Sequence, residues 1–362
     1  MSETPSRDPL LAWQQLVAAL SAAGERMDRA TKDTASADER ADGFRALARA
    51  LSNQLGRLEV DDAKPELVPF NLWRQKFYMD NPDYLYWVAE IAPGGCYRIE
   101  GCAEGAAFLS INVYAAAGLQ ADTVARITSD DLVFDAGRRF SVTLGGTKEE
   151  AEGAWLPLPA NANMVWVRQF FDTPQHEGRD CSITRLDSCT PTPMIEAERF
   201  TRRLSRLAGT LDMASRVIAK AGASETERNS VREWSEMQGG AVFTEPGIHY
   251  QRGAWELAPD EALVIEGRVV QARHWSALLY SRYLNSLDAR NRRVSITGKH
   301  VAADAEGRFR LVLAAKDPGT PNWLDTEGRS FGIFVIRWLQ PETAPLLPTA
   351  RVVKLSDLRA GR

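Results

Sequence analysis

The N-terminal part of the chain carries apolar residues at helical spacing. Five of them recur at intervals of three and four: Leu10, Trp13, Leu16, Val17 and Leu20. A second apolar stripe runs from Phe44 to Leu55 and follows Ser36 and Glu39, which have the spacing of a capping box. The two stripes predict a helical hairpin within a helical N-terminal region, residues 1–80. We expect this hairpin to cover a β-core or to form an oligomer contact.

Residues 81–190 lose the helical period. Short apolar runs alternate there with glycine-bearing turns, which is typical of an antiparallel sheet. The helical period returns in the stripe Phe200–Ile218, and a second helix is predicted over Glu225–Met237. Residues 191–240 are therefore predicted to be a helical connector, and strand-like runs resume in residues 241–362.

Two segments of the chain share one pattern. Each opens with Trp-Leu, at Trp155 and at Trp323, and ends in an apolar strand closed by an arginine, Arg168 or Arg337. Two Ile-Glu-Gly motifs precede these segments at nearly equal spacing, 54 positions (155 minus 101) and 56 positions (323 minus 267) before the tryptophan. This repeat predicts a mainly β fold with α additions. Two tandem antiparallel β-sandwich or jelly-roll-like units would follow each other, joined by the helical connector.

Composition excludes several classes of protein. The chain of 362 residues is 44% hydrophobic and 25% charged, as in ordinary globular domains. A net charge of −4 and a pI near 5.8 favour neither nucleic acid nor an anionic membrane as a partner. No apolar run approaches the roughly 20 residues of a membrane-spanning helix. The polar N-terminus has no signal-peptide pattern, so we expect a cytoplasmic protein with reduced cysteines.

The familiar catalytic and cofactor motifs are absent from the sequence. It contains no phosphate-binding glycine loop, no Gly-x-Ser-x-Gly elbow, no His-Glu-x-x-His and no Cys-x-x-Cys. We therefore predict neither a cofactor nor a metal. The four histidines, His176, His249, His274 and His300, are far apart along the chain, and each is more typical of a structural residue. His249 and His274 lie beside aromatic residues, where a histidine can also act as a general base.

Polar residues interrupt aromatic segments in the second half of the chain. The loop around Asn322, Trp323 and Asp325 is rich in turn-forming residues, whose side chains commonly bond their own backbone. In a functional alternative, Asp325 faces Arg292 or Arg337 across the mouth of a cavity. Aromatic residues of these segments, including Trp275 and Tyr283, would line an apolar pocket or belong to the core.

An arginine cluster lies off the apolar stripe of the first connector helix: Arg202, Arg203 and Arg206. We expect a solvated face there, with anion binding as the alternative.

Asn81, Asp83, Leu85 and Tyr86 form an Asn-x-Asp-x-Leu-Tyr box. In this box the sequence resembles the bacterial family DUF1214 of unknown function. Further matches are Trp275, the segment Leu284–Arg292 and the Asn322–Asp325 loop, so that the resemblance spans roughly residues 37–357. The chain departs from the family pattern at Tyr84, where a small residue is expected. The resemblance implies two jelly-roll-like β-units and no established reaction.

Three classes of function fit these observations. The first is a cofactor-independent enzyme that acts on a hydrophobic oxygenated small molecule, such as a terpenoid, a steroid or an aromatic compound. The predicted acid–base residues are Asp83, Tyr86 and His274. The predicted substrate-binding residues are Asn81, Trp275, Tyr283, Arg292, Asn322, Trp323, Asp325 and Arg337. The alternatives are a non-catalytic binder of the same ligands and a structural or assembly protein, which would form a homo-oligomer.

Overall fold

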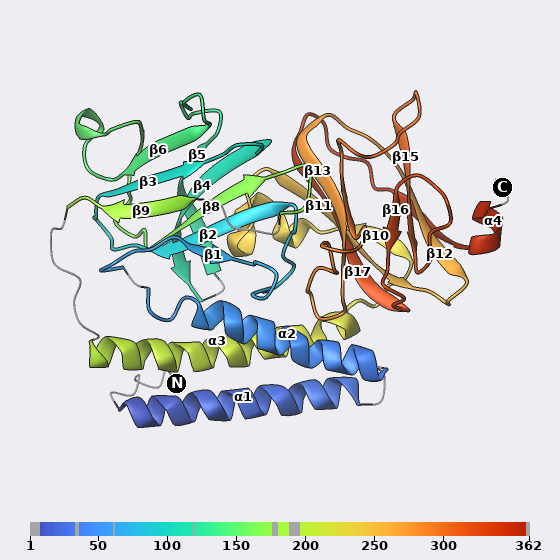
Figure 1. The fold of residues 1–362 in the computed structure, drawn as a ribbon, viewed down its shortest axis with the longest axis horizontal. Helices are drawn as coiled ribbons and strands as arrows, with labels where there is room; N and C mark the ends of the chain where they lie inside the picture. Colours follow the sequence, from blue (N-terminus) through green and yellow to red (C-terminus); the bar gives the residue numbers. More distant parts are fainter. Residues whose placement is uncertain are drawn as a thin grey trace.

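Two β-units stand side by side on a layer of helices (Figure 1). The computed structural model describes residues 8–32, 36–60, 62–118, 120–175, 180–187 and 196–359. The helical layer consists of α1 (Pro9–Thr31), α2 (Ala37–Leu55) and α3 (Ala197–Ser224), and a short helix, α4 (Leu355–Arg359), lies near the C-terminus. No helix in these ranges is both long and apolar enough to cross a membrane.

The first β-unit is a sandwich of two sheets. The five-stranded sheet has the order β1 (Val68–Phe70), β2 (Tyr84–Glu90), β8 (Met164–Phe170), β4 (Phe108–Ala117), β5 (Gln120–Thr128). The four-stranded sheet has the order β7 (Ala154–Leu156), β6 (Arg139–Leu144), β3 (Tyr97–Cys102), β9 (Cys181–Arg185). A 3₁₀ turn, η1 (Lys148–Glu150), precedes β7. All pairings are antiparallel except that of β6 with β7.

The second β-unit has the same strand order. Its five-stranded sheet runs β10 (Ser230–Glu233), β11 (Ile248–Glu256), β17 (Phe331–Pro341), β13 (Ala272–Tyr280), β14 (Ser295–Thr297). Its four-stranded sheet runs β16 (Trp323–Asp325), β15 (Arg308–Ala314), β12 (Glu261–Arg268), β18 (Thr349–Lys354), again with one parallel pair, β15 with β16. A 3₁₀ segment, η2 (Ser235–Phe243), connects β10 with β11. The predicted fold class, with two tandem sheet units, is confirmed.

The landmarks that recur along the sequence occupy matching places in the two sandwiches. Gly101 pairs with Phe140, and Gly267 pairs with Phe309. A Cβ atom at either glycine would come within 2.8 Å or 2.5 Å of the ring of that phenylalanine. Only glycine therefore lets the ring lie across the strand.

Both faces of each five-stranded sheet are buried. Along β2, Leu85 and Trp87 point into the core of the first sandwich, whereas Tyr84 lies on the opposite face. The alternation follows from the two-residue period of a strand. The outer faces of the two sheets pack on each other, and Tyr84 and Tyr250 share one hydrophobic cluster there.

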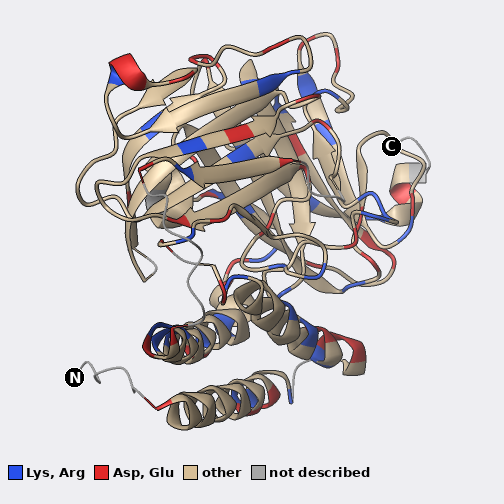
Figure 2. Ribbon diagram, turned by 60° about the vertical axis from the view of Figure 1, so that its left-hand side comes forward, with Lys and Arg blue, Asp and Glu red and all other residues tan. Residues whose placement is uncertain are grey.

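The helical hairpin is confirmed, but α1 presents a different face from the one that its large apolar residues predict. Ser36 caps α2 through the amide of Glu39, as predicted. Leu10, Trp13 and Val17 are exposed. The residues of α1 that pack against α3 include the small Ala12 together with Leu16. Small side chains allow two helices to approach closely, so they set the register here. Figure 2 shows α1 as the outermost helix of the layer.

The prediction of a second connector helix over Glu225–Met237 is wrong. The segment contains strand β10, which pairs with β11 and extends the sheet, followed by η2. Val231 of β10 packs against the core of the second sandwich. Tertiary pairing overrides the local helical pattern here.

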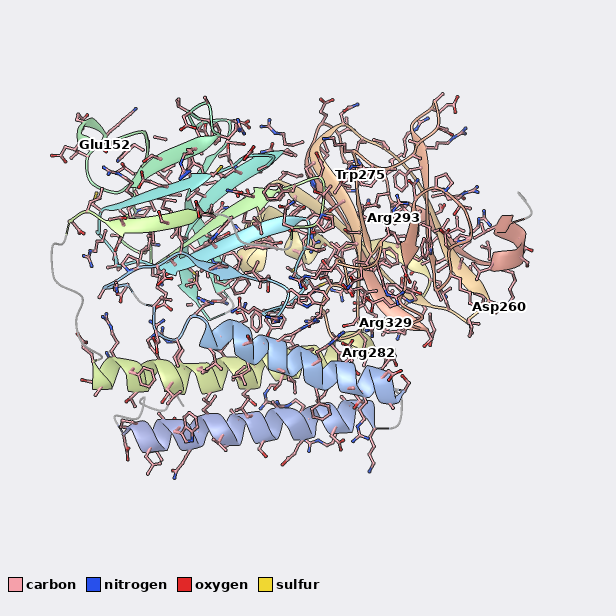
Figure 3. All side chains as sticks on the ribbon, viewed as in Figure 1. Glu152, Asp260, Trp275, Arg282, Arg293 and Arg329 are labelled. Carbon is pink, nitrogen blue, oxygen red and sulfur yellow. The ribbon has the colours of Figure 1, made fainter. Side chains whose placement is uncertain are left out.

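Two arginines of the second unit form ion pairs with α2 of the helical layer. Arg282 makes an ion pair with Glu39 at 3.5 Å, and Arg329 makes one with Asp42 at 3.0 Å. Both arginines lie at the edge of the second unit that faces α2 (Figure 3).

Candidate functional site

A cavity of about 1050 Å³ opens where the two β-units meet the helical layer. Its walls come from the outer face of β2 and β8, from β11 and β17, and from α3. Predicted site residues that line it are Tyr86 and Arg337. The cavity therefore brings together one predicted acid–base residue and one predicted substrate-binding residue, which lie far apart along the chain.

Each five-stranded sheet carries a row of three polar residues on its outer face. In the first unit, Tyr86 and Ser110 lie on either side of Arg168 on neighbouring strands. We call these residues the first Tyr–Arg–Ser row. In the second unit Tyr250 and Ser276 flank Arg337 in the same way, and we call them the second Tyr–Arg–Ser row.

The two rows lie close together. Both guanidinium groups, those of Arg168 and Arg337, influence the pKa of Tyr86 and also that of Tyr250. Burial raises the pKa of Tyr250 to about 12, and it raises that of Tyr86 as well. Both phenols are therefore neutral near pH 7 and can donate hydrogen bonds.

Arg168 of the first row has a carboxylate partner. The Glu245 carboxylate lies 3.5 Å from its guanidinium and accepts hydrogen bonds from Ser110 at 2.6 Å and Asn112 at 2.7 Å. Arg126 binds the other oxygen of this carboxylate at 2.7 and 3.0 Å. The buried positive charge of the first row is thus balanced within the protein, as buried charges usually are.

Arg337 of the second row has no such partner. It is 5% exposed and donates to the Met79 carbonyl at 3.0 Å and to the Tyr280 hydroxyl at 2.7 Å. Its Nη1 has no hydrogen-bond partner, and within the described part of the chain no carboxylate lies at ion-pair distance. Burial by itself lowers the pKa of Arg337, but the surrounding tyrosines outweigh burial and raise it, so the group stays charged.

The two arginines differ in their partners because each β-unit extends a segment over the sheet of the other unit. The segment before β11 places Glu245 over the first sheet, beside Ser110. The segment before β2 places Asn81 over the second sheet, where its amide donates to Ser276 at 3.4 Å. Glu245 and Asn81 each stand five positions before the tyrosine of a row (250 minus 245, 86 minus 81). The second row therefore receives a neutral amide where the first row receives a carboxylate.

Aromatic and sulfur-containing side chains form most of the remaining wall near Arg337. Lining residues of this part of the cavity are Tyr78, Met79, Tyr84, Tyr86, Phe170, Trp234, Met237 and Tyr250. The hydroxyls of Tyr78 and Tyr84 are buried, and neither has a hydrogen-bond partner among the described residues. Burial raises the pKa of both tyrosines, so both remain neutral donors. Arg252 also lines this part, but it is paired with Glu225.

Asp83 and His274 lie beside the cavity rather than in its wall. Asp83 is fully buried and accepts a hydrogen bond from Ser295 at 3.1 Å. Its second oxygen has no partner within the part of the chain that the structure describes. Burial raises the pKa of Asp83 to about 7. His274 contacts the Phe171 carbonyl through Nε2 at 3.0 Å, and burial lowers its pKa.

The Asn-Trp-Leu-Asp loop is held by its own hydrogen bonds, away from the cavity. Asn322 bonds the amide and the carbonyl of Ala302, both at 2.8 Å, and Trp323 donates to the Ala314 carbonyl at 3.0 Å. Asp325 pairs with Arg292 at 2.7 Å. These contacts fit the turn-holding interpretation of the loop and not a place opposite Arg337.

Two further predicted site residues lie in packed clusters. Trp275 stacks on Trp338 at 4.4 Å inside the second sandwich, where Figure 3 labels it. Tyr283 packs with Met27 of α1. Neither side chain is among the described residues that line the cavity.

Sequence reasoning missed several residues of the site. Glu245, Tyr78 and Tyr250 carry no motif, and only their contacts reveal them. The sequence pattern did identify Arg168 as the counterpart of Arg337. It therefore indicated that the two arginines are equivalent, but not which residues contact them. His176 lies outside the described residues. Among the residues that the structure describes, no three His, Cys, Asp or Glu side chains gather as metal ligands do.

Comparisons with known proteins give one family model and two solved structures to which the chain is similar. Residues 257–343 match the family model "Protein of unknown function (DUF1214)", so the predicted resemblance is confirmed over the second β-unit. A crystal structure of an uncharacterized protein from Burkholderia cenocepacia is 27% identical, covers 96% of this chain and 97% of its own, and has a TM-score of 0.86. The VPA0106 protein from Vibrio parahaemolyticus is 12% identical over 86% of this chain and 98% of its own, with a TM-score of 0.46. No curated protein matches the chain.

Proposed function

We propose that the protein binds a hydrophobic small molecule with an acidic oxygen group, a carboxylate or a phenolate, in the cavity between its β-units. The observation that carries this proposal is the charge of Arg337, which lines the cavity and has no carboxylate at ion-pair distance among the residues that the structure describes, while its buried Nη1 has no hydrogen-bond partner there. Burying a cation without an anion is strongly unfavourable. An anionic ligand would supply what Glu245 supplies to Arg168.

The first Tyr–Arg–Ser row supports this assignment, because it shows how the same arrangement holds a carboxylate. There the carboxylate of Glu245 contacts both the arginine and the serine of its row. The second row offers the same two groups, although Ser276 also contacts Asn81. The equal rows and strand orders also favour our interpretation of the two β-units as an internal repeat.

The rest of the cavity favours an apolar ligand body. Rings such as those of Phe170 and Trp234 form its wall, and flat apolar ligands pack well against aromatic side chains. The volume of about 1050 Å³ is at the upper end of the range for small-molecule pockets. The unpartnered hydroxyls of Tyr78 and Tyr84 can donate to ligand oxygens.

Turnover of the bound ligand is the second candidate, and one observation favours it. Tyr86 and Tyr84 are neutral phenols near the guanidinium of Arg337, an arrangement that stabilises oxyanions as they form. Proton transfer would then involve Tyr86. Asp83, although half-protonated near pH 7, lies outside the described cavity wall and would act only through a neighbouring group.

Matched pairs of ligands test the binding proposal. Purified protein is screened by thermal shift against hydrophobic aromatic and terpenoid carboxylates, each beside its methyl ester. A ligand that binds only the folded state raises the melting temperature by mass action. We expect shifts from carboxylates, weaker shifts from esters, and loss of the difference in Arg337→Met. Arg310→Met is the matched control, because Arg310 is a surface arginine of the second unit that pairs with Glu266. Equal shifts from acids and esters, or an unchanged response in Arg337→Met, would refute the role of Arg337.

A further inference from the structure

A second group of arginines lines the other end of the same cavity. Five arginines and two carboxylates line this end: Arg57, Arg199, Arg202, Arg203, Arg206, Asp62 and Glu90. The surplus is three positive charges (five minus two), or two when Glu198, the ion-pair partner of Arg202, is counted. We call this group the arginine mouth.

Arg203 holds the arginine mouth together. It donates to the carbonyls of Leu58 and Arg57, at 2.8 and 2.9 Å, and pairs with Glu90 at 3.0 Å. Arg203 therefore joins α3 to the turn that follows α2 and to β2, and its charge is used within the protein.

Two other arginines of the mouth keep charge available for a ligand. Arg57 has no carboxylate within ion-pair distance among the residues that the structure describes, and its guanidinium stands 5.7 Å from the ring of Phe70. Arg206 is 70% exposed, and its guanidinium lies 4.0 Å from the Glu90 carboxylate, a longer contact than the 3.0 Å ion pair that Arg203 makes with the same carboxylate. These two guanidinium groups remain able to bind an anion at the entrance.

Positions along strand β2 give an estimate of the distance between the arginine mouth and Arg337. Glu90 lies at the mouth, whereas Tyr86 and Tyr84 lie near Arg337. Glu90 stands four positions from Tyr86 and six from Tyr84 (90 minus 86, 90 minus 84). A strand rises about 3.3 Å per residue, so the separation is roughly 13–20 Å. Trp166 of the neighbouring strand pairs with Val88, which lies between Tyr86 and Glu90, and its ring lines the cavity between the two ends.

We propose that the ligand carries two acidic groups, one held by Arg337 and the other by Arg57 and Arg206, with an apolar body between them. This inference rests on the proposed function and defines its ligand class as an amphipathic dianion. One cation at the Arg337 end and the arginine mouth at the other end select for length as well as for charge. Electrostatic attraction at the entrance also favours capture of anions from solution.

Isothermal titration calorimetry with a series of α,ω-dicarboxylates and their monomethyl esters tests the inference. Chain lengths are chosen so that the carboxyl groups reach from well below to above roughly 13–20 Å. In wild-type protein we expect diacids of matching length to bind at least about fivefold tighter than their monoesters at low salt. The advantage should fall as ionic strength rises.

Variants separate the two ends of the cavity. In the double variant Arg57→Met, Arg206→Met the diacid should bind no more tightly than its monoester, and the monoester affinity should stay unchanged. Arg216→Met is the matched control, because Arg216 is an exposed arginine of α3 that pairs with Asp212 and does not line the cavity. Circular dichroism and the melting temperature show whether each variant is folded. The length series is measured in wild-type protein and therefore does not depend on the folding of a variant.

Each outcome decides one of the two claims. If a monoester binds through Arg337 and no diacid binds more tightly, the inference of a dianionic ligand is overturned and the proposed function stands. Failure of monoesters and diacids alike overturns both. A diacid advantage that survives in the double variant shows that the second acidic group does not use the arginine mouth, and this also overturns the inference.

Discussion

Replacing Arg337 with methionine should leave the stability of the ligand-free protein almost unchanged. The side chain would give up two hydrogen bonds, to the Met79 carbonyl at 3.0 Å and to the Tyr280 hydroxyl at 2.7 Å. The Met79 carbonyl would keep a donor, because the Tyr280 hydroxyl also points to it at 3.3 Å. Losing two bonds from a charged donor costs roughly 3 kcal/mol. Removing a buried cation that lacks an anion returns several kcal/mol. We expect the two effects to cancel to within about 1.5 kcal/mol.

Arg168→Met is the matched comparison, because Arg168 occupies the same position in the first unit. Its removal withdraws a cationic donor from the Tyr114 hydroxyl, the Phe243 carbonyl and the Glu245 carboxylate. Breaking a buried ion pair costs about 3–5 kcal/mol, so we expect a loss in this range.

Urea denaturation at neutral pH, followed by tryptophan fluorescence, measures both free energies of unfolding. The expected result is a midpoint near that of wild type for Arg337→Met and a clearly lower one for Arg168→Met, with similar slopes. If Arg337→Met loses about 3 kcal/mol or more, like Arg168→Met, then Arg337 is a structural residue. The argument for an anionic ligand would then fail.

Further substitutions test the partners of the two rows and the polar loop. Glu245→Gln should lower the unfolding free energy by about 3–5 kcal/mol, since it leaves the arginine of the first row buried without its carboxylate; a urea midpoint equal to that of wild type would contradict this. Asn81→Asp should supply an internal anion to Arg337, so that calorimetry detects weaker binding of carboxylate ligands, whereas unchanged affinity would separate this position from the site. Burial raises the pKa of Asp83 to about 7 in the folded protein, above its usual value of about 3.9, so its contribution to stability is full below about pH 4 and is lost as the pH rises through 7. The stability gained in Asp83→Asn should therefore grow with pH to at most about 4 kcal/mol above about pH 8, and a gain that does not vary with pH would refute the shift. Asn322→Ala should cost about 2–3 kcal/mol through its lost backbone bonds and leave ligand affinity unchanged, and a selective loss of binding would return the loop to the site.

The large-scale fold could be predicted because two features of the sequence, strand periodicity and recurring motifs, both indicate the β-units. The strand periodicity indicates sheets, and the glycines of the two Ile-Glu-Gly motifs occupy matching places in the two units, each paired with a phenylalanine. Trp155 and Trp323 even donate to equivalent carbonyls, those of Gly145 and Ala314, both at 3.0 Å. Such local, repeated requirements can be read from one sequence.

Packing choices between elements could not be predicted in the same way. The apolar residues of α1 suggested a buried face around Trp13, yet Ala12 and Leu16 make the contact with α3 and Trp13 stays exposed. Residue type indicates which side chains gain by burial, but not which face fits the neighbouring helix most closely. The segment around Val231 likewise became a strand because an edge of the second sheet was available to pair with it.

The candidate site shows most clearly where sequence reasoning ends. Arg168 and Arg337 close the same motif, and nothing near either residue distinguishes a structural arginine from a ligand-binding one. The distinction comes from Glu245 and Asn81, which lie 77 and 256 positions away (245 minus 168, 337 minus 81) and reach the rows across the interface between the units. A carboxylate at one position and an amide at the other turn two equivalent rows into a balanced ion pair and an unbalanced cation. The proposed role of Arg337 therefore rests on the asymmetry of an exchange between two similar units, and this asymmetry exists only once the chain has folded.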